Sequence, residues 1–503
     1  MKTGVNRILL NTWQFLWACT LVCLPVTSFP LLSAAAGGTL VAPLAIIPLT
    51  LLCCTLIPLH LLHGRSIPRE TIPLLFFVLV AIGASAAANF LDIPSFSDYT
   101  LTGNNLEGFV TLGIGLAFLL ATWMMGALPD GLKKTLVFLE IGGMVLLGWS
   151  CMQLIAALSG GLPAWMEKVQ AFISTSEINS SYTRFRIPGT TLEPSWLAHC
   201  LNILYLPLWL GFTMTRQSAF RFRFHHITVE NLLLIVGIPI LIFTYSRIGL
   251  LTFSFVLLWF VLQLSPSISA RLTSRFFPDQ QVMALPMRVL VAMVLVLMIV
   301  GAAGGTVYVL SLQDSRFESF MEYGSTNRPF ATNLITIAKR MEFGERVISW
   351  DLGWKVFKDH PFLGVGLGNT GMFVLEELSP QAWKSAEIMR VVFEEAALPN
   401  SKNLWIRLLA ETGIAGFSIF ITWLLVLWEA ARRLQHNPGS PWRGIGMTGQ
   451  FTLLALLLEG FSLDTFALPY FWVALGLILA AAMLSRLPAT APGSRQANLQ
   501  KPN

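Results

Sequence analysis

Charged residues are scarce in this chain: Asp, Glu, Lys and Arg make up 12% of its 503 residues, whereas hydrophobic residues make up 54%. A soluble domain has roughly 25% charged residues, so this chain cannot cover itself with a solvated surface. Cysteine is also missing where a disulfide or a thiolate metal site would need it. All six cysteines lie in apolar runs rather than in the long polar segments. This argues against a disulfide framework and against a cysteine-based zinc site.

Apolar runs of about the length that crosses a bilayer, ~20 residues, follow one another along the sequence. The predicted fold class is therefore an all-α polytopic membrane protein of about twelve transmembrane helices. The first run lacks a small-residue cleavage site followed by a soluble domain, so we interpret it as an uncleaved helix. The runs lie near 8–30, 38–62, 72–91, 108–128, 132–158, 195–214, 231–245, 248–264, 289–311, 413–430, 446–463 and 467–485.

Lys and Arg are confined to alternate connections between the runs, with two long exceptions. The connection at 92–107 contains neither residue, whereas the connections on its two sides are basic. Because basic loops stay in the cytoplasm, this bias predicts a multi-pass inner-membrane protein with both termini cytoplasmic. The same bias accounts for the net charge of +6, so no nucleic acid partner is expected.

The two exceptions are long segments predicted outside the membrane, at 159–194 and 312–403. Of the 33 basic residues, eleven lie in the second segment or at its exit, although orientation disfavours basic residues there. This excess places the expected chemistry on the outer, periplasmic face. The predicted parts are helices 1–9 within 1–311, the large helical periplasmic loop 312–403, helices 10–12 within 404–486, and a disordered cytoplasmic tail 487–503.

A helix is predicted within the large loop, from Arg346 to Asp359. Val347, Trp350, Trp354 and Phe357 are spaced by three, four and three residues, which puts them on one face. We expect that apolar face to rest on the membrane or on the helical bundle.

Arg247 is the only charged residue between positions 231 and 264, where two short runs meet on the outside. A charge there is costly unless it meets an anion or a wet cavity. The guanidinium fork matches phosphate oxygens. The alternative is an arginine that extends to the lipid headgroups.

The segment before the sixth run places Arg184, Arg186 and Glu193 at the membrane surface, directly before Pro194. Glu193 and Pro194 suit the start of a helix, where a carboxylate faces the positive helix end. A structural ion pair is one interpretation. The other is a carboxylate that is available as a base.

Two further groups of candidates lie in the large loop. Arg346 precedes the predicted helix, and His360 follows it in a glycine-containing segment that runs to Asn369. The glycines either form a tight turn or let backbone amides approach a phosphate. His360, like His199, is either a structural histidine or a base.

Lys402 and Asn403 close the loop. Arg407 and Glu411 follow at a spacing of four and are expected to pair on one helical face. Glu140 and Glu459 lie inside predicted spans, which makes each a functional candidate whose partner the sequence does not name.

Together these pieces resemble the O-antigen ligase and polymerase superfamily of bacterial envelope glycan assembly. The resemblance covers about residues 180–430 and rests on the order of five motifs. They are Arg-x-x-Gly-x-x-x-Glu-Pro, Ser-Arg between two short spans, Arg-x-x-x-Trp, His-Pro-x-x-Gly-x-Gly-x-Gly-Asn, and Asn-x-x-x-x-x-x-Ala-Glu-Thr-Gly-x-x-Gly. The resemblance implies a metal-independent membrane glycosyltransferase that needs no cofactor. It also implies an undecaprenyl-pyrophosphate-linked glycan as donor, a glycan acceptor, and envelope-assembly proteins as possible partners.

The chain departs from its relatives at the loop exit, where ligases of the superfamily carry His-Asn and this sequence has Lys402-Asn403. A lysine acts as a base only after losing its proton, which needs strong desolvation. The Glu193-Pro194 element instead resembles the version found in many polysaccharide polymerases. We therefore expect a polymerase, with an O-antigen ligase acting on lipid A-core as the alternative.

In this scheme Arg247 and Arg346 stabilise the departing pyrophosphate and Glu193 is the general base. Arg184, Arg186, His360, Lys402 and Asn403 complete the predicted pyrophosphate and substrate contacts. A transporter or flippase is the rival from another class, but it is expected to place coupling residues near the bilayer midplane.

Overall fold

The computed structural model describes residues 3–62, 67–175, 186–223, 225, 227–276, 284–311, 343–380, 382–437 and 439–486. Every regular element within these ranges is a helix. Among them, eight helices are long and apolar enough to cross a membrane, and two shorter apolar helices accompany them. The predicted class, an all-α polytopic membrane protein, is confirmed.

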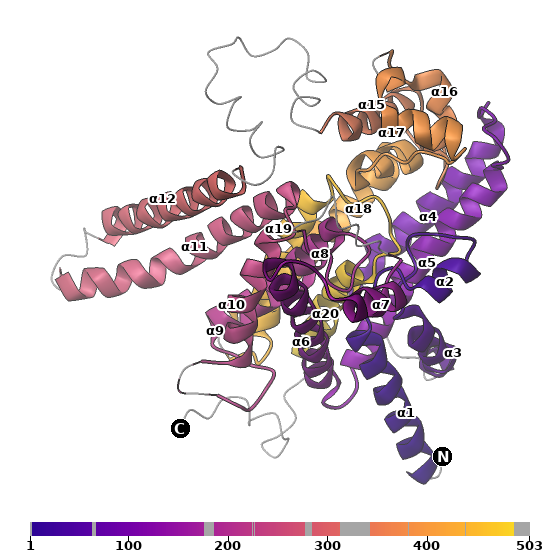
Figure 1. Ribbon diagram of the computed structural model, residues 1–503. Helices are drawn as coiled ribbons and strands as arrows, with labels where there is room; N and C mark the ends of the chain where they lie inside the picture. Colours follow the sequence, from indigo (N-terminus) through magenta and orange to yellow (C-terminus); the bar gives the residue numbers. More distant parts are fainter. Residues whose placement is uncertain are drawn as a thin grey trace.

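Each predicted apolar run contains a helix (Figure 1). The helices are α1 (Thr3–Val22), α3 (Ile46–Leu62), α4 (Ile72–Ala87), α5 (Leu101–Gly126), α6 (Gly131–Leu158), the continuous run α8 (Pro194–Cys200), η3 (Leu201–Tyr205) and α9 (Leu206–Thr215), then α10 (Val229–Ile242), α11 (Arg247–Phe276), α12 (Ala284–Ser311), α18 (Leu404–His436), α19 (Arg443–Glu459) and α20 (Pro469–Arg486).

Two of these helices form the centre of the bundle. All residues of α20 from Pro469 to Ala482 are buried, as are those from Leu197 to Phe212 in the α8–α9 run. Other helices therefore surround these two on every side. Trp423 of α18 packs against Trp472 of α20 with ring centroids 5.9 Å apart.

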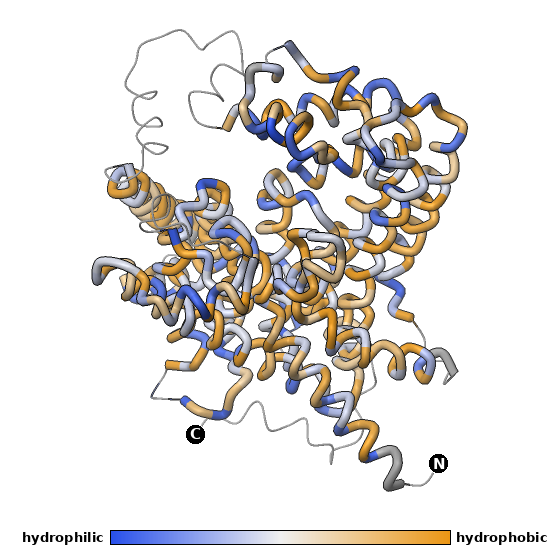
Figure 2. The backbone as a smooth tube through the Cα atoms, turned by 45° about the vertical axis from the view of Figure 1, so that its right-hand side comes forward, coloured by the Kyte–Doolittle hydropathy of each residue, from blue (hydrophilic) through white to orange (hydrophobic). Residues whose placement is uncertain are grey.

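The remaining short helices lie between the spans. They are α2 (Pro30–Ala35), α7 (Ala164–Ile173), α15 (Gly344–Asp359), α16 (Val374–Glu377) and α17 (Ala386–Met389). In Figure 1, α15, α16 and α17 lie at the end of the bundle opposite the start of α1, and we call this the loop end. Figure 2 shows more hydrophilic segments there than along the long helices.

Contacts between distant segments fix the opposite end of the bundle. Arg486, the last residue of α20, pairs with Glu70 directly before α4. The amide of Gly444 at the start of α19 donates to Gln217 Oε1 after α9, at 2.6 Å. These contacts join the end of α20 to the start of α4 and the start of α19 to the end of α9.

Helix α15 is confirmed, but the face that it buries against the bundle differs from the predicted apolar face. Its buried apolar residues are Ile348, Leu352 and Val356, spaced by four, whereas Trp354 is 46% exposed. The reason is the partner: α15 packs on α18, and at Gly353 an added Cβ would lie 2.6 Å from Ile406. The close approach selects small and aliphatic residues and leaves Trp354 to stack on Phe357 at 5.3 Å.

One predicted boundary is also wrong. Helix α11 continues past residue 264 to Phe276, so it is a long helix rather than a short span. Helix α18 begins at Leu404, where the predicted segment of the last three helices starts, and its backbone is interrupted at Gly413 (φ 63°, ψ −171°).

The glycine-containing segment after His360 fills that interruption. Val365 N donates to Ala410 O and Gly366 N to Glu411 O, both at 2.9 Å, so carbonyls freed by the break in α18 regain donors. On the other side Leu367 N donates to Ser85 Oγ of α4 at 3.1 Å. These amides are engaged by protein groups, which favours the tight-turn interpretation of the glycines over the phosphate cradle.

Candidate functional site

Glu193 stands at the start of α8, on a segment that the bundle holds tightly. Gly189 has φ +60°, and its amide and carbonyl bond the side chain of Gln153 at 2.9 and 3.1 Å. A Cβ at Gly189 would lie 2.8 Å from Ser150 Oγ, so the turn requires glycine. The Glu193 side chain is exposed and accepts a hydrogen bond from Ser195 Oγ at 3.0 Å. A carboxylate is thus presented on a rigid base.

Arg186 and Arg247 both lie close to the connection between α10 and α11. Arg186 Nε donates to Thr244 O at 3.3 Å, and Ile187 N donates to Phe243 O at 3.1 Å. Arg247 is the first residue of α11, three positions after Thr244. The first turn of α11 also packs closely on α8, since a Cβ at Gly249 would lie 2.7 Å from that of Ala198. The structure therefore brings Arg186, Glu193 and Arg247 to the loop end of two neighbouring helices.

Arg346 and Asn403 meet a second part of this end, the connection between α19 and α20. Arg346 Nη1 donates to Ser462 O at 3.4 Å, and Leu404 N donates to Gly460 O at 2.8 Å. Asn403 is buried and caps α18, since its Oδ1 accepts from Trp405 N at 2.9 Å and from Ile406 N at 3.2 Å. Asn403 thus has a clear structural task at the loop exit.

Lys402 also has a structural partner. Its ammonium group pairs with the carboxylate of Glu387, two residues after Ser385, whose hydroxyl donates to Glu345 Oε1 at 3.1 Å. The hydrogen bond with Glu345 and the pair with Lys402 lower the pKa of Glu387 to about 2. The same hydrogen bond with Glu387, followed by burial, raises the pKa of Glu345. Lys402 is therefore engaged in an ion pair with Glu387, a structural contact that does not favour a role as the base.

His360 does not join Arg346. The two residues stand at opposite ends of α15, 14 positions apart, which is about 20 Å along a helix axis. The His360 ring packs against Phe373 with centroids 5.7 Å apart. Arg184, the remaining candidate, lies outside the described residues, as do the segment 312–342 and the tail from 487.

The predicted pair of Arg407 and Glu411 is confirmed at 3.0 Å. Arg407 also donates to Asp464 O and lies over the ring of Phe466, 5.8 Å from its centroid. Part of the basic excess at the loop end therefore holds α18 to the segment before α20.

Sequence reasoning missed one arrangement: Glu459, His199 and Asn202 form a buried polar cluster beneath Glu193 and Arg247. Glu459 stands out in the sequence as a charge inside a span, and His199 as a histidine near the outer face. The signal that could have joined them is that each is a polar residue within a strongly apolar run.

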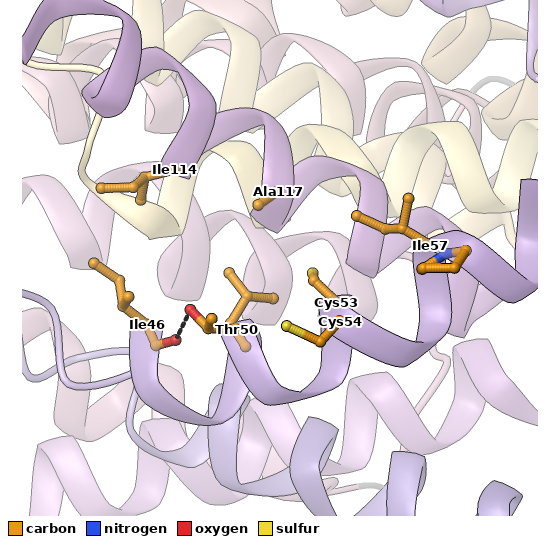
Figure 3. Close-up of a pocket in the computed structure, with 9 residues that line it drawn as sticks. Ile46, Thr50, Cys53, Cys54, Ile57, Ile114 and Ala117 are labelled. Carbon is orange, nitrogen blue, oxygen red and sulfur yellow. Dashed lines mark hydrogen bonds between the residues drawn. The ribbon is translucent and has the colours of Figure 1, made fainter. Parts of the chain in front are cut away.

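The structure also has an apolar groove of about 420 Å³ between α3 and α5, lined by Leu49, Cys53 and Ile114 among others (Figure 3). Its one hydroxyl, that of Thr50, donates to Ile46 O at 2.9 Å within α3. The groove offers no charged group for a phosphate, and none of the candidate residues lines it. Within the described ranges, no three His, Cys, Asp or Glu side chains are grouped to hold a metal ion.

Comparison with known proteins gives one family. Residues 232–421 match the model of the family described as O-antigen ligase. The match spans α10 to the first half of α18 and therefore includes Arg247, Arg346, His360, Lys402 and Asn403. No curated protein matches the chain. The resemblance to the O-antigen ligase and polymerase superfamily is confirmed.

Proposed function

We propose that this chain, whose residues 232–421 match the model of the O-antigen ligase family, is a metal-independent glycosyltransferase that polymerises undecaprenyl-pyrophosphate-linked repeat units. The family and the membrane helices together make it a bacterial membrane protein of a glycosyltransferase-like class. The distribution of Lys and Arg supports an inner-membrane location, with the loop end in the periplasm and both termini in the cytoplasm.

The proposed reaction joins two lipid-linked glycans. A hydroxyl oxygen of the acceptor sugar forms a bond to the anomeric carbon of the donor, and the bond from that carbon to the diphosphate breaks. The electron pair leaves with undecaprenyl diphosphate, and the hydroxyl proton passes to the base. Negative charge therefore builds up on the diphosphate while a proton is removed on the other side of the sugar.

Arginines supply the first requirement. Arg247 and Arg346 are proposed to bind the diphosphate, with Arg186 beside Arg247. Guanidinium groups stay charged and donate along a fixed fork, so they stabilise a leaving diphosphate electrostatically. The hydrogen bonds from Arg186 to the carbonyl of Thr244 and from Arg346 to the carbonyl of Ser462 support this assignment to the loop end.

The second requirement is a base, and the identity of the base distinguishes a polymerase from a ligase. Lys402, which replaces the histidine of ligases, is paired with Glu387, whereas Glu193 is exposed on a rigid turn. An exposed carboxylate meets an acceptor hydroxyl and accepts its proton within hydrogen-bond distance. This contrast between Glu193 and Lys402 supports the polymerase over the alternative, a ligase that transfers glycan to lipid A-core.

The experiment that tests this class of function uses purified protein in detergent micelles with EDTA present. Given lipid-linked repeat unit, the protein is expected to join glycans, because the proposed chemistry uses arginines and a carboxylate and needs no gradient. Chain lengths are read on a gel after release of the glycan. A transporter or flippase has no vectorial task in micelles, so unchanged substrate would contradict the proposal.

A further inference from the structure

The buried cluster beneath Glu193 and Arg247 consists of Glu459, His199 and Asn202. Glu459 Oε2 lies 2.6 Å from His199 Nδ1, and Glu459 Oε1 accepts from Asn202 Nδ2 at 2.6 Å. The Glu459 side chain has no exposed surface and that of His199 has 3%. We call these three residues the Glu459 cluster.

Stability alone does not explain such a cluster. Taking a carboxylate out of water into a membrane protein is costly, and well-packed apolar residues often serve stability as well or better. Short hydrogen bonds at both oxygens instead fix the positions of the groups that make them. The role of the cluster therefore follows from the backbone segments that its three residues hold in place.

Asn202 connects the cluster to the first turn of α11, which begins at Arg247. Its Nδ2 donates to Gly249 O at 2.8 Å as well as to Glu459, and Gly249 stands two positions after Arg247 in the first turn of α11. The bond thus fixes the turn from which the Arg247 side chain projects.

The backbone carbonyl of Glu459 connects the cluster to the segment that Arg346 contacts. It is the last residue of α19, and its carbonyl accepts from Ser462 N at 2.8 Å and from Leu463 N at 2.9 Å. The carbonyl of the same Ser462 accepts the hydrogen bond from Arg346. The position of Glu459 therefore helps to fix the backbone of the α19–α20 connection, which Arg346 contacts.

His199 links the cluster to α8, six positions after Glu193 and about 9 Å along the helix axis. Asn202 follows in η3, a π-helical turn, where the wider helix frees a carbonyl and Thr452 Oγ1 donates to Ile203 O at 2.8 Å. Single π turns inside α-helices are common at functional sites. Here the turn carries the side chain that bridges α8, α11 and α19.

We propose that Glu459 is a positioning residue that holds Arg247 and Arg346 in the spacing that the diphosphate requires. This inference rests on the proposed function, because it assumes that the two arginines bind the diphosphate of the donor. Glu459 itself is buried below them and acts through Asn202 and through the connection at Ser462.

The test is Glu459→Gln, read by the affinity of the purified protein for farnesyl diphosphate, a short polyprenyl diphosphate. Glutamine keeps the size of the side chain but has an NH2 group in place of one carboxylate oxygen, so one of the two oxygen contacts, with Asn202 Nδ2 or with His199 Nδ1, is lost. Affinity is expected to fall about 10-fold. Asn202→Ala, which removes the bond to Gly249 and leaves the pair of Glu459 and His199, is expected to act in the same direction.

The matched control is Glu140→Gln. Glu140 is also a fully buried carboxyl in a span, and it accepts from Trp209 Nε1 at 2.7 Å, away from both arginines. Glutamine keeps an oxygen that can accept from Trp209, so this replacement of a buried carboxyl is expected to leave affinity within about twofold of wild type. Equal effects of the Glu140 and Glu459 variants on affinity would reduce the cluster to a structural role and overturn the inference.

A double variant decides whether Glu459 acts through Arg247. Residues that act as one unit show non-additive effects. Arg247→Lys combined with Glu459→Gln is therefore expected to weaken binding of farnesyl diphosphate by less than the product of the two single effects, whereas fully multiplied effects contradict the inference. If Arg247→Lys itself leaves affinity unchanged, the proposed role of Arg247 fails. If it weakens binding and Glu459→Gln does not, only the positioning role fails.

Discussion

Replacing Glu193 with glutamine is expected to slow glycan transfer by about 10²–10⁴-fold, the range that loss of a general base produces. Glutamine keeps the size of the side chain and much of its hydrogen bonding, including an oxygen that can accept from Ser195. It removes the basic oxygen that would take the hydroxyl proton. Affinity for farnesyl diphosphate should stay near the wild-type value, because Glu193 does not bind the diphosphate in this scheme. Initial rates and affinity are measured on the same purified preparations.

Two control variants make this result specific. Lys402→Met removes the ion pair with Glu387, and His360→Gln removes a ring that packs on Phe373. Both are expected to reduce transfer only mildly, through lower stability of the helices α15 to α17. A severe loss in either variant, together with a mild effect of Glu193→Gln, would assign the base to Lys402 or His360 instead.

Replacing Arg247 with alanine is expected to abolish glycan transfer while the protein remains in the membrane at its normal level. Arg247→Lys should restore little activity, because lysine keeps the charge but lacks the fork that binds two phosphate oxygens at once. Transfer rate and affinity for farnesyl diphosphate are the measurements. Arg443→Ala, an exposed arginine at the start of α19 on the opposite end of the bundle, is the control and should retain activity.

The lysine variant separates the two interpretations of Arg247. If the arginine only extends to the lipid headgroups, lysine serves equally well, since both side chains place a charge at the membrane surface. Full transfer activity in Arg247→Lys would therefore favour the headgroup interpretation and remove Arg247 from the proposed diphosphate contacts.

Much of the fold could be predicted from sequence because apolar length is a strong local signal. Each predicted run contains a helix, and the position of Gly413, the predicted start of a span, is where α18 is interrupted. The features that were not predicted depend on packing between helices. The buried face of α15 is set by α18, and neither the small residue at Gly353 nor the distant Ile406 enters a periodicity count.

The candidate site was predictable as a set of residue types and not as a set of contacts. Arg247 and Glu193 stand out because a charge at a membrane boundary is unusual. The partners of Lys402 and Glu459 do not, since Glu459 and His199 are 260 positions apart and meet only when α8 packs on α19. Sequence therefore names the charges, and tertiary structure shows which of them are already paired.

The product formed from a single substrate tests the central claim most directly. Purified protein is given lipid-linked repeat unit alone, and the glycans are resolved by length. As a polymerase, the protein should produce a ladder of longer lipid-linked chains, which disappears in Glu193→Gln and persists in Lys402→Met. Absence of any product until a lipid A-core acceptor is added would contradict the polymerase and identify the chain as a ligase.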